Sequence, residues 1–212
     1  MSAGASCRSV SRRNIGDRSI TVSLGGERVQ GPRRDAGFVH PAPSLLPNMT
    51  ALRNVLLAAS LRGLRAADFE LQARELLALS GAADHADDPA SSLSVPMALR
   101  VAVCRALLPG PSVLLLDDPF SQADPLDREQ LCRDLQRLHL ERPVTTLLAG
   151  ACIHEAVLLA DRVAVASPSG AIARVLEVEL PRPRRLDKAT SPKVAEYCAV
   201  LRMTLEALGA LA

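Results

Sequence analysis

The sequence predicts an α/β protein whose sheet contains parallel strands, joined to a helical subdomain at about residues 50–108. Three observations predict this class. A short apolar run at residues 113–116 lies between Pro111 and Pro119, as is typical of a strand buried on both faces. From that run to Ala166, segments of strand and helix type alternate. Two earlier segments carry the apolar spacing of amphipathic helices.

Composition places the chain among ordinary globular proteins. Its 212 residues are 48% hydrophobic and 23% charged, which suits one domain with a subdomain and a substantial core. Only 2% are aromatic, so Leu, Val and Ala must build that core, and the scarcity of base-stacking side chains argues against a nucleic-acid partner.

The 5 cysteines form no C-x-x-C pair, so neither a disulfide framework nor a zinc site is expected. No apolar run approaches the ~18 residues of a membrane-spanning helix, and no such span is expected.

The N-terminal part is expected to hold little regular structure. Residues 1–18 are rich in Ser and Arg and show no apolar periodicity, which predicts a disordered, basic N-terminus. Residues 20–24 and 27–30 flank a Gly-Gly turn and predict a β-hairpin. One further short strand is expected at residues 37–39.

Residues 50–108 are predicted to form a helical subdomain. Thr50, which follows a proline-rich loop, is the expected N-cap of the first helix. Gly63 separates this helix from a second one, and a polar stretch separates the second from a third, which runs from about Met97 to Leu108. The apolar positions that repeat at helical spacing are Leu52, Val55, Leu56 and Ala59, then Phe69, Ala73, Leu76 and Leu77.

The C-terminal half continues the alternation. Asp124 followed by Pro125 provides an N-cap and a first-turn proline for a helix that runs to about Leu140. A basic connector at residues 181–188 precedes the last helix. In order, we expect a strand at 144–148, a helix at 154–160, a strand at 162–166, a hairpin that ends at Leu180, and a final helix at about 192–208.

Two carboxylates end the apolar strand. Asp117 and Asp118 come directly after it and precede Pro119. The carboxyl ends of parallel strands are where α/β sheets bind ligands. In a Walker B strand the first Asp holds Mg²⁺ through water, and the second carboxylate polarises the attacking water. Taken alone, the same pattern fits a strand that stops in an Asp-Pro turn equally well.

Several blocks of residues occur in an order that is more specific than any one motif. They are residues 37–39 with 45–47, 54–57, 93–107, 111–121, 155–163 and 180–184. Together they resemble the ATP-binding subunit of an ATP-binding cassette (ABC) transporter, in particular the nitrate, sulfonate and taurine importer subfamily. The resemblance implies a P-loop-NTPase-like ABC nucleotide-binding domain over residues 19–180, with the connector and C-terminal helix at 181–212.

The resemblance implies roles for four residues. Asp117 matches the Asp that is linked to Mg²⁺ through water, and Asp118 stands at the position of the catalytic glutamate. Ser94 matches the signature serine and Asp124 matches the D-loop aspartate, which together form the implied nucleotide-binding residues. From the residues alone, Asp124 is sufficiently explained as the N-cap of the helix that follows it.

Two of these sites depart from the family pattern. Asp118 is one methylene shorter than the Glu it replaces, which draws the base back by more than about 1 Å, and a misplacement of that size can cost ~10²-fold in rate. Val95-Pro96 stands where two glycines let backbone N–H groups approach a phosphate of the opposing subunit. Proline has no N–H and valine adds bulk, so this anion site is expected to be compromised.

The Q-loop glutamine and the switch histidine of the family are replaced as well. Pro41 stands at the first position, with His40 beside it, and Ala151 stands at the second. A proline cannot contact Mg²⁺ or sense a permease as the glutamine does. His154 lies three residues after Ala151 and is expected at the surface rather than as its substitute.

The phosphate-binding loop of the family has no counterpart that we can identify. Lys188 and Lys193 are the two lysines of the sequence, so residues 1–187 contain no lysine for a P-loop. We therefore expect the domain to lack the P-loop segment. In the family fold the strand of that segment lies between the strands expected at 144–148 and 162–166, so the resemblance predicts a gap in the sheet there.

The resemblance implies an ATP-binding-subunit-like protein of a nitrate, sulfonate or taurine-type importer with lost or impaired ATP hydrolysis. The implied partners are a transmembrane permease subunit and a second ABC subunit, at the cytoplasmic face of a membrane. The implied cofactors are ATP and Mg²⁺ if nucleotide binds, and none otherwise. Two alternatives stay open: a non-catalytic interaction or regulatory module that pairs with an intact ABC ATPase or permease, and a decayed gene product.

Overall fold

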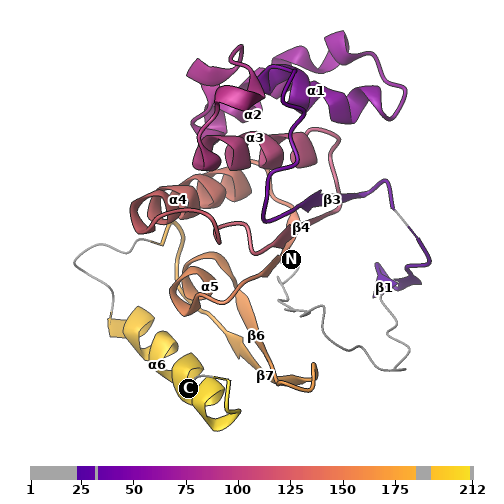
Figure 1. Cartoon of the computed structure of the whole chain (residues 1–212). Helices are drawn as coiled ribbons and strands as arrows, with labels where there is room; N and C mark the ends of the chain where they lie inside the picture. The colour runs from indigo at the N-terminus through magenta and orange to yellow at the C-terminus, as the bar shows by residue number, and fades with distance from the viewer. Residues whose placement is uncertain (1–22, 32, 185–191, 211–212) are drawn as a thin grey trace.

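The computed structural model describes residues 23–31, 33–184 and 192–210. Over these residues the chain is mixed α/β, as predicted (Figure 1). The expected disordered N-terminus and residues 185–188 of the connector lie outside the described part. The helices are α1 (Ala51–Ser60), α2 (Glu70–Ser80), α3 (Val95–Leu107), α4 (Pro125–Glu141), α5 (Ile153–Leu159) and α6 (Pro192–Ala207), with short 3-10 turns at Ala66–Phe69, Ala83–His85 and Ala90–Ser92. The strands are β1 (Ser23–Leu24), β2 (Glu27–Arg28), β3 (Ala36–Val39), β4 (Val113–Asp117), β5 (Thr145–Ala149), β6 (Arg162–Ala166) and β7 (Ile172–Glu177).

Helices α1, α2 and α3 group at one end of the molecule, above the sheet in Figure 1. Thr50 caps α1 as predicted, because its side-chain oxygen accepts a hydrogen bond of 3.1 Å from Arg53 N. Helix α3 begins at Val95, two residues before the predicted start, because Ser94 caps it in the same way through Met97 N. The predicted apolar positions that are buried are Leu52, Val55, Ala59, Ala73, Leu76 and Leu77.

Strands β3, β4 and β5 form a parallel sheet in the order β3-β4-β5. Its register aligns Val39 with Leu116 and Leu116 with Leu148. One face of this sheet packs on α3, most closely at Gly37. A Cβ added at Gly37 would lie 2.8 Å from the carbonyl oxygen of Ala106, so a glycine is required for β3 to approach α3 this closely.

Strands β6 and β7 form a separate antiparallel pair. Helix α6 packs beside them, and Val163, Val165 and Leu201 contribute to a second, smaller core. Within the described ranges β5 and β6 do not pair, so the strands expected on either side of the predicted gap belong to different sheets. Among the described helices, none combines the length and the apolar character that a bilayer span requires.

Two buried polar networks join these parts. The Arg100 guanidinium of α3 donates hydrogen bonds of 2.9 and 2.7 Å to Asp134 Oδ2 on α4. Beyond the end of α5, the buried Arg184 guanidinium donates to four backbone carbonyl groups, including those of Val157 and Ala160. The Arg184 backbone also exchanges hydrogen bonds of 2.6 and 2.8 Å with the Gln136 amide of α4. The first network joins α3 to α4 within the larger core, and the second links the segment after β7 to α4 and α5.

Candidate functional site

The carboxyl ends of the three parallel strands meet at one edge of the sheet. Asp117, the last residue of β4, pairs in register with Ala149, the last residue of β5, and Val39 ends β3 one step earlier. The segments that follow these strands therefore begin side by side. The fold places the Asp117-Asp118 pair and the positions of Pro41 and Ala151 at this edge. The place of the two carboxylates agrees with the expectation from the sequence.

Asp118 occupies a left-handed backbone conformation with φ of 42°. Its N–H donates a 2.7 Å hydrogen bond to the Ala149 carbonyl, and its own carbonyl accepts from Ser121 Oγ at 2.9 Å. A Cβ added at Gly150 would lie 3.8 Å from Asp118 Oδ1, so this carboxylate is directed toward the end of β5. A non-glycine residue in this region stores backbone strain, which the surrounding hydrogen bonds must hold. Asp117, by contrast, is exposed.

A buried carboxylate beneath this turn is absent from the sequence-based set. Glu155 on α5 is 7% exposed, and its Oε1 lies 3.5 Å from Arg128 Nη1 on α4. Burial raises the pKa of Glu155; the positive charge of Arg128 opposes this rise and the negative charge of Asp118 adds to it. The sequence offered no signal for this residue, because an acid in the first turn of a short helix is ordinarily exposed.

Arg128 also holds the loop that follows Asp118. Its Nε donates a 2.8 Å hydrogen bond to the Ala123 carbonyl, and its Nη2 lies 3.5 Å from the Ser121 carbonyl. The side chain thus connects the loop between β4 and α4 with α5. We assign it a positioning role for the candidate site, since it contacts the loop backbone rather than a ligand.

Asp124 and Ser94 both act as helix N-caps. Asp124 Oδ1 accepts a 2.9 Å hydrogen bond from Asp127 N, and Ser94 Oγ accepts one of 3.4 Å from Met97 N. Each side chain therefore has a structural role that needs no nucleotide. The capping interpretation of Asp124 in the sequence is confirmed.

Ser94 stands apart from the strand ends. Helix α3 contacts β3 near Ala106, and Ser94 lies 12 residues earlier, roughly 18 Å away along the helix axis. Val95 and Pro96 form the first positions of α3, where a helix presents free N–H groups to an anion. Pro96 removes one of these donors and Val95 covers the approach with a side chain that is 42% exposed.

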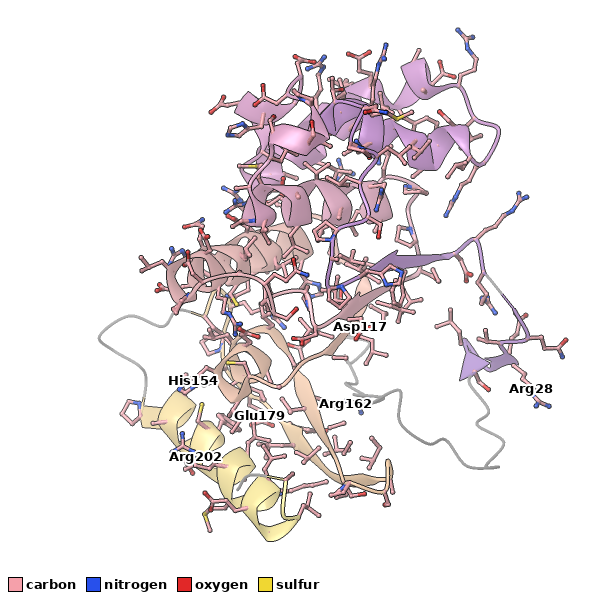
Figure 2. The ribbon with its side chains drawn as sticks, viewed as in Figure 1. Arg28, Asp117, His154, Arg162, Glu179 and Arg202 are labelled. Atoms are coloured by element: carbon pink, nitrogen blue, oxygen red, sulfur yellow. The ribbon has the colours of Figure 1, made fainter. Side chains whose placement is uncertain are left out.

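The remaining substituted positions carry no replacement group. His40, beside Pro41, packs its ring against Phe38 with the ring centroids 4.4 Å apart. Ala151 is exposed and lies in the loop before α5. His154 is exposed on α5 and lies toward α6, well away from Asp117 (Figure 2), as expected from the sequence.

The donor set at this edge does not fit a hydrolytic Mg²⁺–ATP site. Asp117 offers one carboxylate, but Pro41 and Ala151 offer no oxygen or nitrogen side-chain ligand next to it. In the part of the chain that the structure describes, no group of three or more His, Cys, Asp and Glu side chains is arranged to hold a metal ion. Among the described residues this edge presents the Asp117 carboxylate, and the positions of Pro41 and Ala151 beside it carry no polar side chain.

Comparisons with known proteins agree on one family. The sequence profile described as ABC transporter matches residues 12–121. A bicarbonate transport ATP-binding protein, CmpC, of Synechococcus elongatus is 37% identical over 176 residues, which are 81% of this chain and 26% of that protein. The aliphatic sulfonates import ATP-binding protein SsuB 1 of Xanthomonas axonopodis pv. citri is 42% identical over 166 residues, 77% of this chain and 66% of that protein. The chain thus spans less than two thirds of either relative.

A solved structure shows the same fold. The dimeric bacterial ABC transporter cassette MJ0796 superimposes with a TM-score of 0.59 at 27% sequence identity, over 70% of this chain and 66% of that chain. The match confirms the predicted cassette-like arrangement of a parallel sheet and helices.

Proposed function

Because the chain belongs to the ABC transporter ATP-binding family, in the importer subfamily of the nitrate and sulfonate systems, we propose that it is an ATP-binding-subunit-like component of such an importer with lost or severely impaired ATP hydrolysis. Members of the family bind ATP with Mg²⁺. In this chain Asp117 stands at the family's Mg²⁺-linked position without neighbouring donors at Pro41 and Ala151, and Asp118, Ser94 and Asp124 stand at altered nucleotide-contacting positions.

One observation carries the proposal. The fold brings Pro41, Asp118 and Ala151 to the same edge of the sheet, so three of the family's reactive groups are replaced at a single place. Losses at one site act on the same chemical step, because removing any member of a catalytic set disables the rest. The missing N–H of Pro96 removes a further group that would contact phosphate from an opposing subunit.

The proposed setting follows from the family. The partners are a transmembrane permease subunit and a second ABC subunit, and the location is the cytoplasmic face of a membrane. The bicarbonate and sulfonate relatives carry their transport roles in their names. We extend to this chain the class of a small-anion importer, and no particular anion.

Measuring nucleotide binding and hydrolysis by the purified chain tests the proposal. We expect Mg²⁺-dependent phosphate release from the chain to equal that of the Asp117→Asn variant, which serves as the background control. We also expect Asp118→Glu to leave the rate unchanged, because the positions of Pro41 and Ala151 stay empty of polar groups. Tight ATP binding with turnover that disappears in Asp117→Asn would overturn the proposal.

A second candidate function is a non-catalytic module that binds an intact ABC ATPase or a permease through its helices. Exposed leucines favour it: Leu61, Leu64 and Leu71 on and between α1 and α2 are 78%, 45% and 74% exposed. These three side chains come from one stretch of 11 residues and offer apolar surface for contact with a protein partner. Co-purification with a permease would support this function if Leu61→Arg abolishes it and Leu126→Arg retains it. Leu126 lies on α4 and is equally exposed. Recovery of no partner with either variant would refute this function.

A further inference from the structure

A basic surface surrounds α1. Residues 36–67, which include α1, contain three arginines and no Asp or Glu, and residues 89–116, which include α3, contain two arginines and no Asp or Glu. One of these five, Arg100, is neutralised by Asp134. The other four together with Arg34 form what we call the basic face: Arg34, Arg53, Arg62, Arg65 and Arg105.

Hydrogen bonds to backbone groups bring three segments of the basic face together. Arg62 donates to the carbonyl groups of Arg34 and Pro109, and Arg105 donates a 2.7 Å hydrogen bond to the Ser44 carbonyl. Neutral carbonyl groups leave the positive charges in place. In the part of the chain that the structure describes, the ion pairs include none of the five arginines. The face therefore keeps its charge for a partner.

Two leucines protrude from the basic face where α1 ends. Leu61 is 78% exposed and Leu64 is 45% exposed, and Arg62 and Arg65 follow them directly in the sequence. Gly63, between the two leucines, has φ of 76° and no atom within 4 Å of an added Cβ, so this turn is open to solvent. Apolar side chains that stand out this far do not line a concave ligand site.

The neighbouring helix α2 carries the opposite charge. Residues 66–88, which include α2, contain six acidic residues and one arginine. That arginine, Arg74, is paired with Glu70. A negatively charged surface would attract the side of α1 and repel the side of α2. Such a surface would therefore hold the molecule in one orientation.

We infer that the basic face binds a bilayer surface rich in anionic phospholipid, with Leu61 and Leu64 inserted among the headgroups and the five arginines beside the phosphates. Exposed leucine next to arginine is the pattern of proteins that lie in the plane of a membrane interface. The apolar stem of an arginine can lie along the acyl boundary while its guanidinium stays among the headgroups. Each arginine near such a surface strengthens binding by about fivefold.

The leucines distinguish this partner from other anions. A nucleic acid would engage the arginines but leave Leu61 and Leu64 in water, and residues 53–65 contain no aromatic side chain on which a base could stack. An acidic protein would need a preformed apolar site opposite both protruding side chains. A lipid surface deforms around them and needs no such match.

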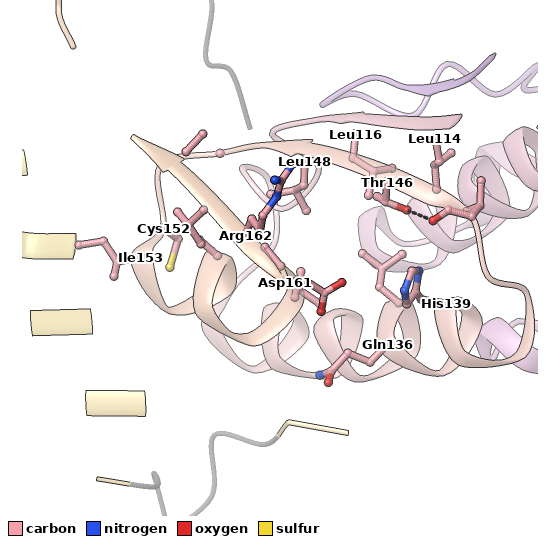
Figure 3. A pocket seen from close by; sticks show the side chains of 18 of the residues that line it. Leu114, Leu116, Gln136, His139, Thr146, Leu148, Cys152, Ile153, Asp161 and Arg162 are labelled. Carbon is pink, nitrogen blue, oxygen red and sulfur yellow. Dashed lines mark hydrogen bonds between the residues drawn. The ribbon is translucent and has the colours of Figure 1, made fainter. Parts of the chain in front are cut away.

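An apolar cavity of about 210 Å³ lies elsewhere in the molecule and does not account for the basic face (Figure 3). It lies between β6 and the sheet face that carries Leu114 and Leu116, and none of the five arginines of the basic face lines it. Its lining includes Asp161, which is paired with Arg182 at 2.8 Å. An anionic headgroup placed there would meet the Asp161 carboxylate, so we place the lipid at the surface around α1.

This inference goes beyond the proposed function and does not depend on the loss of ATP hydrolysis or on any protein partner. It concerns the surface around α1, whereas the proposed function concerns the reactive groups at the carboxyl edge of the sheet. Failure of the inference would leave the ATPase result unaffected, and the reverse also holds.

Flotation with vesicles tests the inference on the full 212-residue chain. We expect the chain to bind vesicles of phosphatidylcholine with about one third phosphatidylserine, and to bind pure phosphatidylcholine at least about tenfold more weakly. Arg53→Glu combined with Arg65→Glu should weaken binding to the anionic vesicles by about 25-fold or more, because two attractive charges become repulsive. The control is Arg12→Glu combined with Arg13→Glu, which changes the net charge equally. Its binding should stay within about threefold of the unaltered chain, because screening confines the attraction to charges near the surface.

Tryptophan reporters locate the inserted side chains. The chain contains no tryptophan, so Leu61→Trp introduces a single emitter. Its emission should shift to shorter wavelength on anionic vesicles, because the side chain leaves water. Leu71→Trp, at a position of α2 that is 74% exposed, should show no shift. Leu61→Arg should still bind anionic vesicles, because it adds a positive charge, although it should abolish the protein contact of the second candidate function.

Three results would overturn the inference. The first is equal binding of the unaltered chain to anionic and neutral vesicles, or binding to neither, and this comparison needs no variant to fold. The second is an equal loss of binding in the two double variants, since the attraction would then not depend on the basic face. The third is an unshifted emission of Leu61→Trp on vesicles together with tight binding of an acidic peptide or an oligonucleotide that Arg53→Glu with Arg65→Glu abolishes, since the face would then serve another anionic partner.

Discussion

The ion pair between Arg100 and Asp134 is predicted to be essential for holding α3 on α4. The two side chains are only 12% and 7% exposed, and Asp134 Oδ2 accepts two hydrogen bonds from the one guanidinium. Asp134 Oδ1 accepts a third hydrogen bond, from Gln130. Replacing Asp134 by Ala leaves a buried cation without a partner.

The magnitude follows from this burial. Removing one member of a buried pair costs about 3–5 kcal/mol, because the remaining charge cannot be solvated. With a urea m-value of ~2–3 kcal/mol/M, the unfolding midpoint of Asp134→Ala should fall by about 1–2.5 M. The change also matters for the candidate site, since Ser94 caps α3 and Asp124 caps α4.

Urea unfolding followed by circular dichroism measures the effect. The control is Glu129→Ala on the same helix: Glu129 pairs with Arg133, but the two side chains are 37% and 44% exposed, so the cost should stay below about 1 kcal/mol. Arg100→Met combined with Asp134→Leu should cost less than Asp134→Ala alone, because no charge is left unpaired. Equal midpoints for Asp134→Ala and Glu129→Ala would refute the reasoning.

Three further predictions concern packing and titration. Gly37→Ala should lower the free energy of unfolding in urea by about 1–3 kcal/mol, because the new Cβ would meet the Ala106 carbonyl. Gly31→Ala is the control and should be close to neutral, because no atom lies within 4 Å of its added Cβ. Equal effects of the two substitutions would contradict the packing of β3 on α3. Leu77→Ala, at a fully buried position, should cost about 2–5 kcal/mol, against less than about 0.5 kcal/mol for Leu71→Ala; similar melting temperatures would count against the core. Burial raises the pKa of the Cys104 and Cys132 thiols from 9.0 to about 12. The thiols of the unfolded chain lose their protons at lower pH, so the free energy of unfolding should fall as pH rises from about 9 toward 12. At pH 8 these thiols should react with a disulfide reagent only in denaturant. Fast reaction of both thiols in the native chain would disprove their burial.

Most local structure could be predicted from the sequence because it depends on neighbours along the chain. The capping of α1 by Thr50 and of α4 by Asp124 was predicted from residue type and spacing, and both caps form. The strand at 113–116 was predicted from its apolar run and proline flanks. The ends of the helices are less predictable. The apolar spacing favours a start of α3 at Met97, but the helix begins two residues earlier, at Val95, because Ser94 caps it.

The candidate site was only partly predictable. Asp117 and Asp118 can be identified from the sequence because adjacent carboxylates after a strand are a local pattern. The strand order that places them at the same edge as Pro41 and Ala151 comes from the fold. Arg128 and Glu155 could not be predicted, because they lie 27 positions apart in the sequence and come within 3.5 Å of each other only in the fold. No periodicity marks such a pair, since their contact depends on how α4 and α5 pack.

Residue identity and short-range spacing are enough to indicate the family, most helices and strands, and the residue types that replace the family's reactive groups. Which groups are buried, and which strand edges of the described residues stay unpaired, depends on tertiary packing. It brought Glu155 beneath the Asp118 turn, enclosed Arg184 within carbonyl groups of α5 and the β7 extension, and left β5 and β6 on opposite sides of a cavity. Burial and pairing are sums over contacts between distant segments, so they appear only once the chain is folded.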